Sequence, residues 1–208
     1  MNVLSMLSLF HRGKNMKEDD LIELMKERWT ARKFSSEEIS EEDLNKIIEA
    51  GRWSPSGGNK QPWELIIIRD EDKKQKIAEL FAEGMGLSEP SERYTTPPVL
   101  IAVGIDTRVI ESYPDMMPAE FVVYASIGAM VQNMSLVASS MGMVLSWGTQ
   151  PIKVHDKLKD LLEVPDHIYV PDVLQLGYPD QEKHSSSRRE KEQFTHDDQI
   201  DESNLREI

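Results

Sequence analysis

Residues 54–63 read SPSGGNKQPW, and the apolar run ELIII follows at once. Glycine and proline usually mark a surface turn, but a tryptophan followed by a strand indicates that this turn packs against a large neighbour. Gly57 and Gly58 can adopt positive φ and let a planar ligand approach the main chain, while Ser56 and Asn59 offer uncharged hydrogen bonds. Composition alone leaves two interpretations open: a ligand-holding loop, or a tight helix-to-strand connection stapled by its final tryptophan.

Helices and strands alternate on both sides of this loop. Apolar residues at helical spacing predict a helix over 18–28, and a capping-box pattern at Ser40 and Asp43 opens a second one over 40–51. Surface helices are predicted over 70–84 and 155–164, and a long apolar helix over 119–141. Short apolar runs predict strands over 65–69, 99–106, 143–149 and 173–180. The run LIIIR, at 65–69, is typical of a strand buried on both faces. This alternation predicts a single α/β or α+β domain.

The helix predicted over 119–141 is the longest apolar segment. Its length alone would permit a membrane span, but Glu120 opens it, and Gln132 and Asn133 interrupt it. Small residues such as Gly128 permit close helix packing. We therefore predict a helix buried in a core or a subunit interface, and no membrane association.

Composition excludes several classes of function. The chain has 208 residues with a formal net charge of −13, which argues against nucleic acid as a partner because phosphate backbones need basic surfaces. An anionic ligand must then be captured by a local cluster of cations. No cysteine is present, so disulfides and thiolate metal sites are excluded. We predict no metal site and a cytoplasmic location.

The two ends differ from the middle of the chain. Residues 1–16, MNVLSMLSLFHRGKNM, have no basic residue before the apolar part and no small-residue cleavage pattern after it, so they do not resemble a signal peptide. We predict a leader outside the fold, or an upstream start codon with Met16 as the natural start. From about Asp180 the chain is charged and poor in apolar residues, and residues 196–208 are predicted to be a charged tail outside the domain at 17–195.

Two groups of arginines could bind an anion. Arg28, Thr30 and Arg32 occur in ERWTARKF, residues 27–34, and a guanidinium binds phosphate through two parallel hydrogen bonds. The alternative is a helix C-terminus whose cations complement its dipole. Arg188 and Arg189 form a basic pair in an acidic tail, which matters only if it folds back toward Arg28.

The order of these motifs resembles that of the nitroreductase family of flavoproteins. R-W-T-x-R-x-F, W-S-P-S-G-G-N-x-Q-P-W, GAMVQN, MGMVLSWGT, LQLGYP and a basic pair follow one another over about residues 17–195. The resemblance implies an α+β fold with a central mixed or antiparallel sheet flanked by helices. It also implies an intertwined homodimer with two FMN sites at its interface.

Carried over position by position, the resemblance implies roles in cofactor binding. Arg28 would bind the phosphate, Arg32 would lie near flavin N1 and the C2 carbonyl, and Arg188 or Arg189 would complete the phosphate site. The 55–59 loop would come from the other subunit, and 146–149 would face the opposite side of the ring through main-chain groups. The full set is Arg28, Trp29, Thr30, Arg32, Pro55, Ser56, Gly57, Gly58, Asn59, Ser146, Trp147, Gly148, Thr149, Arg188 and Arg189.

This sequence also departs from the family pattern. Trp29 stands where the family more often has serine or another small polar residue, so it would narrow the site or pack on the flavin edge. The tail after Arg189 lacks the family's usual proline and aromatic ending, which leaves open whether Arg188 or Arg189 binds the phosphate.

The implied function is an FMN-dependent oxidoreductase with ping-pong kinetics. Hydride would pass from NADH or NADPH to flavin N5, and then to a small acceptor such as a nitroaromatic, a quinone or a free flavin. Such chemistry needs no catalytic side chain, in keeping with a sequence where no Ser/His/Asp set stands out. Two alternatives remain: a specialised flavin enzyme for reductive dehalogenation or flavin fragmentation, and a non-catalytic flavin-binding protein.

Overall fold

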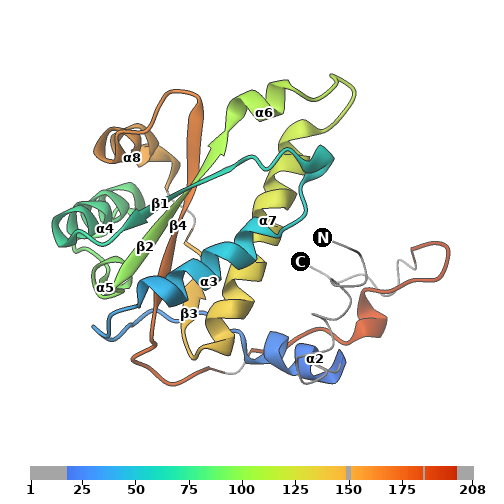
Figure 1. Ribbon diagram of the computed structural model, residues 1–208, viewed down its shortest axis with the longest axis horizontal. Coiled ribbons are helices and arrows are strands. Elements are labelled where there is room, and N and C mark those ends of the chain that lie inside the picture. The colour runs from blue at the N-terminus through green and yellow to red at the C-terminus, as the bar shows by residue number, and fades with distance from the viewer. Residues whose placement is uncertain (1–17, 149–150, 185, 201–208) are drawn as a thin grey trace, which may run out of the picture.

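A computed structural model describes residues 18–148, 151–184 and 186–200 (Figure 1). The helices are α2 Glu18–Glu27, α3 Glu41–Arg52, α4 Glu71–Met85, α5 Glu92–Thr95, α6 Thr107–Glu111, α7 Ala119–Ser140 and α8 His155–Leu162, with 3-10 turns η1 Gly57–Asn59, η2 Ile152–Val154 and η3 Lys191–Gln193. The strands are β1 Trp63–Ile68, β2 Val99–Asp106, β3 Val144–Ser146 and β4 Ile168–Gly177. The α+β prediction is confirmed.

The strands form one antiparallel sheet in the order β1-β2-β4-β3. β4 begins at Ile168 rather than at the predicted 173, because it continues through Pro171, a residue that normally interrupts a strand. The register between β2 and β4 shifts between Val103 and Ile105, so Pro171 falls opposite a bulge, where the missing N–H of proline costs no ladder hydrogen bond.

β1 corrects one expectation. The run at 65–69 was expected to be a strand buried on both faces, yet only Ile68 of β1 is buried and the rest of the strand is partly or fully exposed. Among the described residues β1 pairs only with β2, so it is an edge strand. The side chains of an edge strand receive cover from fewer neighbours, which is information that local composition does not carry.

Helices cover both faces of the sheet (Figure 1). α3 and α7 bury one face, through Ile47 and Met130 against Ile101. α4, α5 and α8 bury the other, through Phe81 and Leu158 with their neighbours. Each such side chain contributes about 1.5–3 kcal/mol when fully buried, so these two layers provide the driving force of the fold.

α3 begins where the sequence predicts. Ser40 Oγ accepts a hydrogen bond from the Asp43 N–H at 3.0 Å, and it also donates one to Asp43 Oδ2 at 2.9 Å. This N-cap satisfies one of the free N–H groups at the start of a helix. The end of α3 then leads directly into the glycine-rich loop.

α7 is covered on one side only. Met130 and Met134 are fully buried, whereas Phe121 is 74% exposed and Tyr124 is 45% exposed. The helix meets the length and composition of a membrane span, a test that the core helices of soluble proteins also pass, and 44% of its most apolar stretch is buried inside the chain. The open stripe, which also includes Gln132, stays predicted as a subunit interface.

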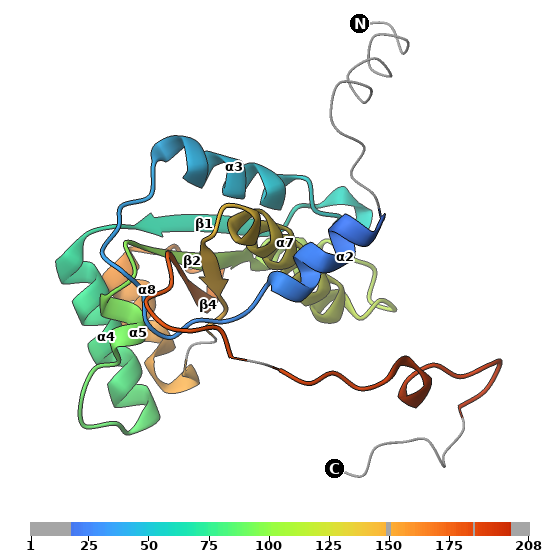
Figure 2. The same ribbon diagram turned by 90° about the horizontal axis from the view of Figure 1, so that it is seen from below.

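After β4 the chain leaves the body as an arm (Figure 2). At its base Lys183 Nζ forms an ion pair with Glu27 at 2.8 Å, and the ring of His184 meets Trp29 edge-on at 5.4 Å. Farther out, η3 lies well away from the sheet. The predicted leader, 1–16, and most of the predicted tail, 196–208, lie outside the described residues, so those boundaries stay predictions.

Candidate functional site

The arginine motif, residues 27–34, is hydrogen-bonded to the end of β3. Ala31 is fully buried, and its carbonyl accepts a hydrogen bond from Ser146 Oγ at 2.8 Å. Arg28 Nη1 donates to the Trp29 carbonyl at 3.1 Å, while Thr30 is exposed. Two segments that are distant in sequence, both predicted to hold the cofactor, therefore adjoin in one chain.

Gln181 fixes the next residues of the motif. Its Oε1 accepts hydrogen bonds from the N–H groups of Arg32 and Lys33, each at 2.8 Å. The main chain is thereby held at the base of the arm, and the Arg32 side chain lies at the surface.

Trp29 packs inward beside the motif. It lies against the cluster of Ala31, Phe34 and Val144 and against His184 of the arm. Trp29 is larger than the serine that the family pattern favours here, and within one chain it joins the arm to the body.

Arg93 of α5 also belongs to this region, although no sequence motif pointed to it. Its Nη2 donates to the Trp147 carbonyl at 2.6 Å, and its Nε donates to Gln175 Oε1 at 2.7 Å. The adjacent Tyr94 is buried, and burial raises the pKa of its phenol while the charge of Arg93 opposes that shift. The only available sequence signal was a cation in an acidic surface stretch, which is too common to be informative.

These arginines lack carboxylate partners. No carboxylate oxygen of the described residues lies within 4.0 Å of Arg28, Arg32 or Arg93. Neighbouring cations do form such pairs: Lys26 with Glu23, Lys33 with Glu92, and Lys183 with Glu27. In a chain of net charge −13, arginines without a carboxylate partner are suited to an anion. Arg93 already donates to Trp147 and Gln175, so Arg28 and Arg32 are the better candidates.

The glycine-rich loop is anchored to α7 of its own chain. The Tyr113 hydroxyl donates to the Gly57 carbonyl at 2.6 Å, and the Gly57 N–H donates to Ser126 Oγ at 3.3 Å. Gly58, Asn59 and Gln61 have φ of 57°, 53° and 47°. Left-handed conformations are costly for residues with a Cβ and persist where the surroundings enforce them, so this loop has a fixed shape.

The loop presents a free tip. Pro55, Gly58 and Asn59 are exposed, and Ser56 is partly buried. Among the described residues, no hydrogen bond or ion pair joins residues 55–59 to the arginine motif. Within one chain the loop and the arginines are therefore not joined by any of these bonds.

The remaining predicted positions are only partly accounted for. Trp147 is 44% exposed, and Gly148 is buried. Arg188 and Arg189 lie on the arm, where Arg188 Nη1 bonds Ser186 Oγ at 2.8 Å and Arg189 stacks on Phe194 at 5.9 Å. The arm that carries this pair runs away from the sheet (Figure 2). Thr149 lies outside the described residues.

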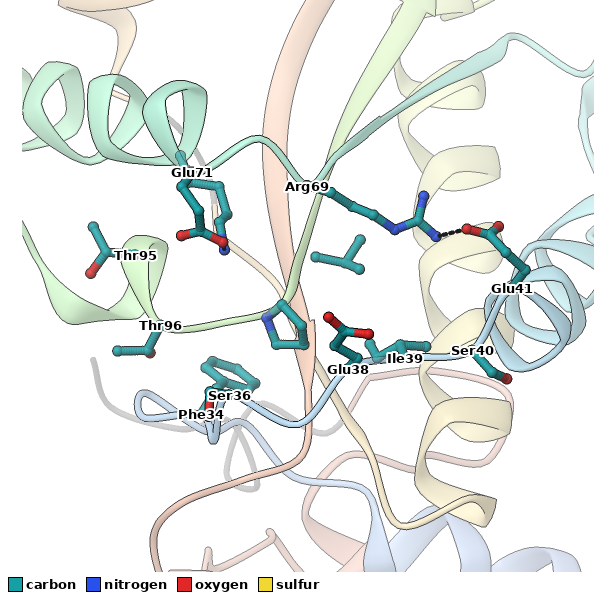
Figure 3. A pocket seen from close by; sticks show the side chains of 13 residues that line it. Phe34, Ser36, Glu38, Ile39, Ser40, Glu41, Arg69, Glu71, Thr95 and Thr96 are labelled. Carbon is teal, nitrogen blue, oxygen red and sulfur yellow. Dashed lines mark ion pairs between the residues drawn. The ribbon is translucent and has the colours of Figure 1, made fainter.

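A separate cleft of about 790 Å³ lies at the N-terminal ends of α3 and α4 (Figure 3). Its cations are already neutralised: Arg69 pairs with Glu41 at 2.6 Å, and the buried Lys74 pairs with Glu71 at 2.7 Å. This cleft therefore offers no free positive charge for a phosphate.

Comparison with known proteins matches residues 25–178 to the family model described as "Nitroreductase family". A protein of Archaeoglobus fulgidus named "Putative NADH dehydrogenase/NAD(P)H nitroreductase" is 32% identical over 167 residues, which cover 79% of this chain and 88% of that protein. Iodotyrosine deiodinase 1 of Mus musculus is 24% identical over 185 residues, covering 79% of this chain and 64% of the deiodinase.

Among solved structures, the NADPH:FMN oxidoreductase from Vibrio harveyi complexed with NAD+ superposes with a TM-score of 0.74. The match covers 88% of this chain and 78% of that one, at 23% identity. At this identity the likeness concerns the fold.

Proposed function

This chain belongs to the nitroreductase family, and we propose that it is an FMN-dependent NAD(P)H oxidoreductase. The observation that carries the proposal is the pair Arg28 and Arg32, which no described carboxylate neutralises, on the motif that Ala31 joins to Ser146. When bound, FMN supplies hydride transfer through N5 between a reduced nicotinamide and an acceptor.

The residues present fit this cofactor. Arg28 has free donors for the dianionic phosphate. Arg32, whose main chain is fixed by Gln181, would place a positive charge near N1, where reduction develops negative charge, and so favour the reduced form. The main chain at Ser146–Gly148 would face the ring, as the family resemblance implies.

We further propose that the site is completed by a second copy of the chain. The loop at 55–59 has a fixed shape and an exposed tip, and it stands on α7, whose exposed stripe is apolar around Phe121. Pairing two such stripes would bury apolar surface at about 25 cal/mol per Å² and carry each loop to its partner's ring. Arg188 or Arg189 would then reach a phosphate through the arm.

The acceptor class follows the family: a nitroaromatic, a quinone or a flavin, with ping-pong kinetics and a cytoplasmic location. Reductive dehalogenation is the second candidate, and the similarity to iodotyrosine deiodinase 1 supports it. Mixing the flavin-loaded protein with a reduced nicotinamide separates both enzymatic functions from non-catalytic flavin binding.

Stopped-flow mixing of the FMN-loaded protein with NADH and with NADPH tests the proposal. We expect at least one of them to bleach the flavin absorbance within the dead time or in seconds, and a nitroaromatic or quinone to restore it. Restoration only by a halogenated phenol would favour the dehalogenase. A bound flavin that neither nucleotide bleaches would reject the oxidoreductase and leave a binding role.

A further inference from the structure

A closed set of hydrogen bonds surrounds the Trp147–Gly148 peptide. Arg93 donates to the Trp147 carbonyl at 2.6 Å and to Gln175 Oε1 at 2.7 Å. Gln175, which is fully buried, donates through Nε2 to the Val173 carbonyl. The Val173 N–H donates to the Gly148 carbonyl at 2.9 Å. Two successive carbonyls, of Trp147 and Gly148, are therefore bound to the same assembly.

Close packing around Gly148 also holds this peptide in place. A Cβ at Gly148 would lie 2.5 Å from Gln175 Nε2, 2.9 Å from the Val173 carbonyl oxygen and 3.0 Å from the Tyr94 hydroxyl. Real Cβ atoms essentially never make contacts as short as the first two, and the third is tighter than most. The main chain at 148 thus sits directly on the polar assembly, and only glycine fits there.

The direction of the remaining donor follows from peptide geometry. A peptide unit is planar and trans, so its N–H points opposite to its C=O. Because the Trp147 carbonyl points to Arg93, the Gly148 N–H points away from Arg93. No described residue accepts a hydrogen bond from it, although Gly148 is buried. Backbone N–H groups in folded proteins are usually paired, so this one is left to donate to a ligand.

We propose that Arg93 and Gln175 are positioning residues that hold the Trp147–Gly148 peptide so that the Gly148 N–H faces the ring of the bound cofactor. This inference rests on the FMN function proposed above. Arg93 acts through the peptide and not by binding the phosphate, so its loss changes the rate of flavin reduction more than the affinity for FMN. Gln175 gives Arg93 its second contact and thereby fixes the plane of the guanidinium.

Two variants test the assembly, and a third is a matched control. Arg93→Lys keeps the charge but cannot bond both acceptors in the same plane. Gln175→Met has similar length and removes the acceptor. Arg108→Lys is the control, because Arg108 also makes two-point contacts, with Asp106 on the exposed surface. Should Gln175→Met fail to fold, Arg93→Lys alone decides.

The first measurement needs no flavin. The exchange rate of the Val173 amide, followed by NMR in the FMN-free protein, should rise about tenfold or more in Arg93→Lys and Gln175→Met, since local opening governs exchange. It should not change in Arg108→Lys. Unchanged Val173 exchange in both test variants overturns the proposal, whatever the protein binds.

The second measurement uses the FMN-loaded protein. The rate of flavin reduction by the preferred nucleotide should fall on the order of ten- to a hundredfold in the test variants, with the FMN dissociation constant within about threefold of wild type because the Arg28 contact is intact. If Val173 exchange is faster but the rate of flavin reduction is unchanged, the Trp147–Gly148 peptide does not act on the flavin ring and the proposal is overturned. If the wild-type chain does not bind FMN, the proposed function fails, and the Val173 result still decides whether the assembly holds the peptide.

Discussion

Gly57→Ala should destabilise the protein far more than Gly58→Ala does, although the two residues are adjacent. A Cβ at Gly57 would overlap Val122 Cγ1 and lie 2.6 Å from the Tyr113 hydroxyl. Overpacking typically costs about 1–3 kcal/mol, and loss of the Tyr113–Gly57 hydrogen bond adds about 0.5–1.5 kcal/mol. The free energy of unfolding should therefore fall by about 1.5–4.5 kcal/mol.

Gly58→Ala supplies the matched comparison. A Cβ there meets only the Lys60 side chain, at 3.6 Å. Its cost comes from φ of +57°, about 1–2 kcal/mol for an L-residue, reduced by about 0.4–1 kcal/mol through the less flexible unfolded chain. We expect a net loss of about 0–1.6 kcal/mol.

Urea unfolding with a common slope measures both variants, and Val122→Ala identifies the cause. Removing the Val122 methyls relieves the closest overlap, so Gly57→Ala combined with Val122→Ala should cost about 1–2 kcal/mol less than the sum of the single changes. If Gly57→Ala unfolds at the same urea concentration as wild type, or the two changes are additive, the loop is not packed on α7 and the reasoning fails.

Three further outcomes are expected. Arg28→Ala should weaken FMN binding about ten- to a hundredfold in a fluorescence titration, because a charge-assisted hydrogen bond contributes about 1.5–3 kcal/mol. Arg108→Ala is the control. If Arg28→Ala and wild type bind FMN with equal affinity, Arg28 is not part of the site. Sedimentation at falling protein concentration should show a dimer that releases FMN as it dissociates, so a monomer that retains flavin would contradict a shared site. Bonds from Arg52, then from Trp53, lower the pKa of Glu49 from 4.5 to about 2. The stabilisation from this carboxylate is thus present above pH 4.5 and lost as pH falls toward 2. NMR titration of wild type, with the Glu49 signal assigned by its loss in Glu49→Gln, should give a midpoint near 2, and a midpoint near 4.5 would show that the contacts do not form.

Local pattern was sufficient for much of the fold. The short apolar run at 99–106 predicts β2, and the long apolar run at 119–141 predicts α7, because the length of an apolar run separates strands from helices. The edge position of β1 could not be predicted, since burial on the second face depends on which strands pair. The start of β4 was missed because the bulge that tolerates Pro171 is set by its partner strand.

The candidate site, like the fold, could be predicted only in part from local sequence pattern. Arg28 and the Ser146–Gly148 segment were found through motifs, and the structure joins them through Ala31. Arg93 and Gln175 are 82 positions apart, and neither has a local pattern that distinguishes it from an ordinary surface cation or a strand amide. Their proximity arises from tertiary packing. The role of the arm arginines depends on a second chain, which local pattern within one sequence does not specify.

The absorption spectrum of the purified protein, followed by release and identification of the chromophore, tests the central claim most directly. A chain that uses Arg28 and its neighbours to hold FMN should be yellow, with flavin absorbance that matches equimolar FMN after denaturation. Denatured wild-type protein provides the stoichiometry, and Arg28→Ala purified in parallel should carry less. A colourless protein that also takes up no added FMN would contradict the account.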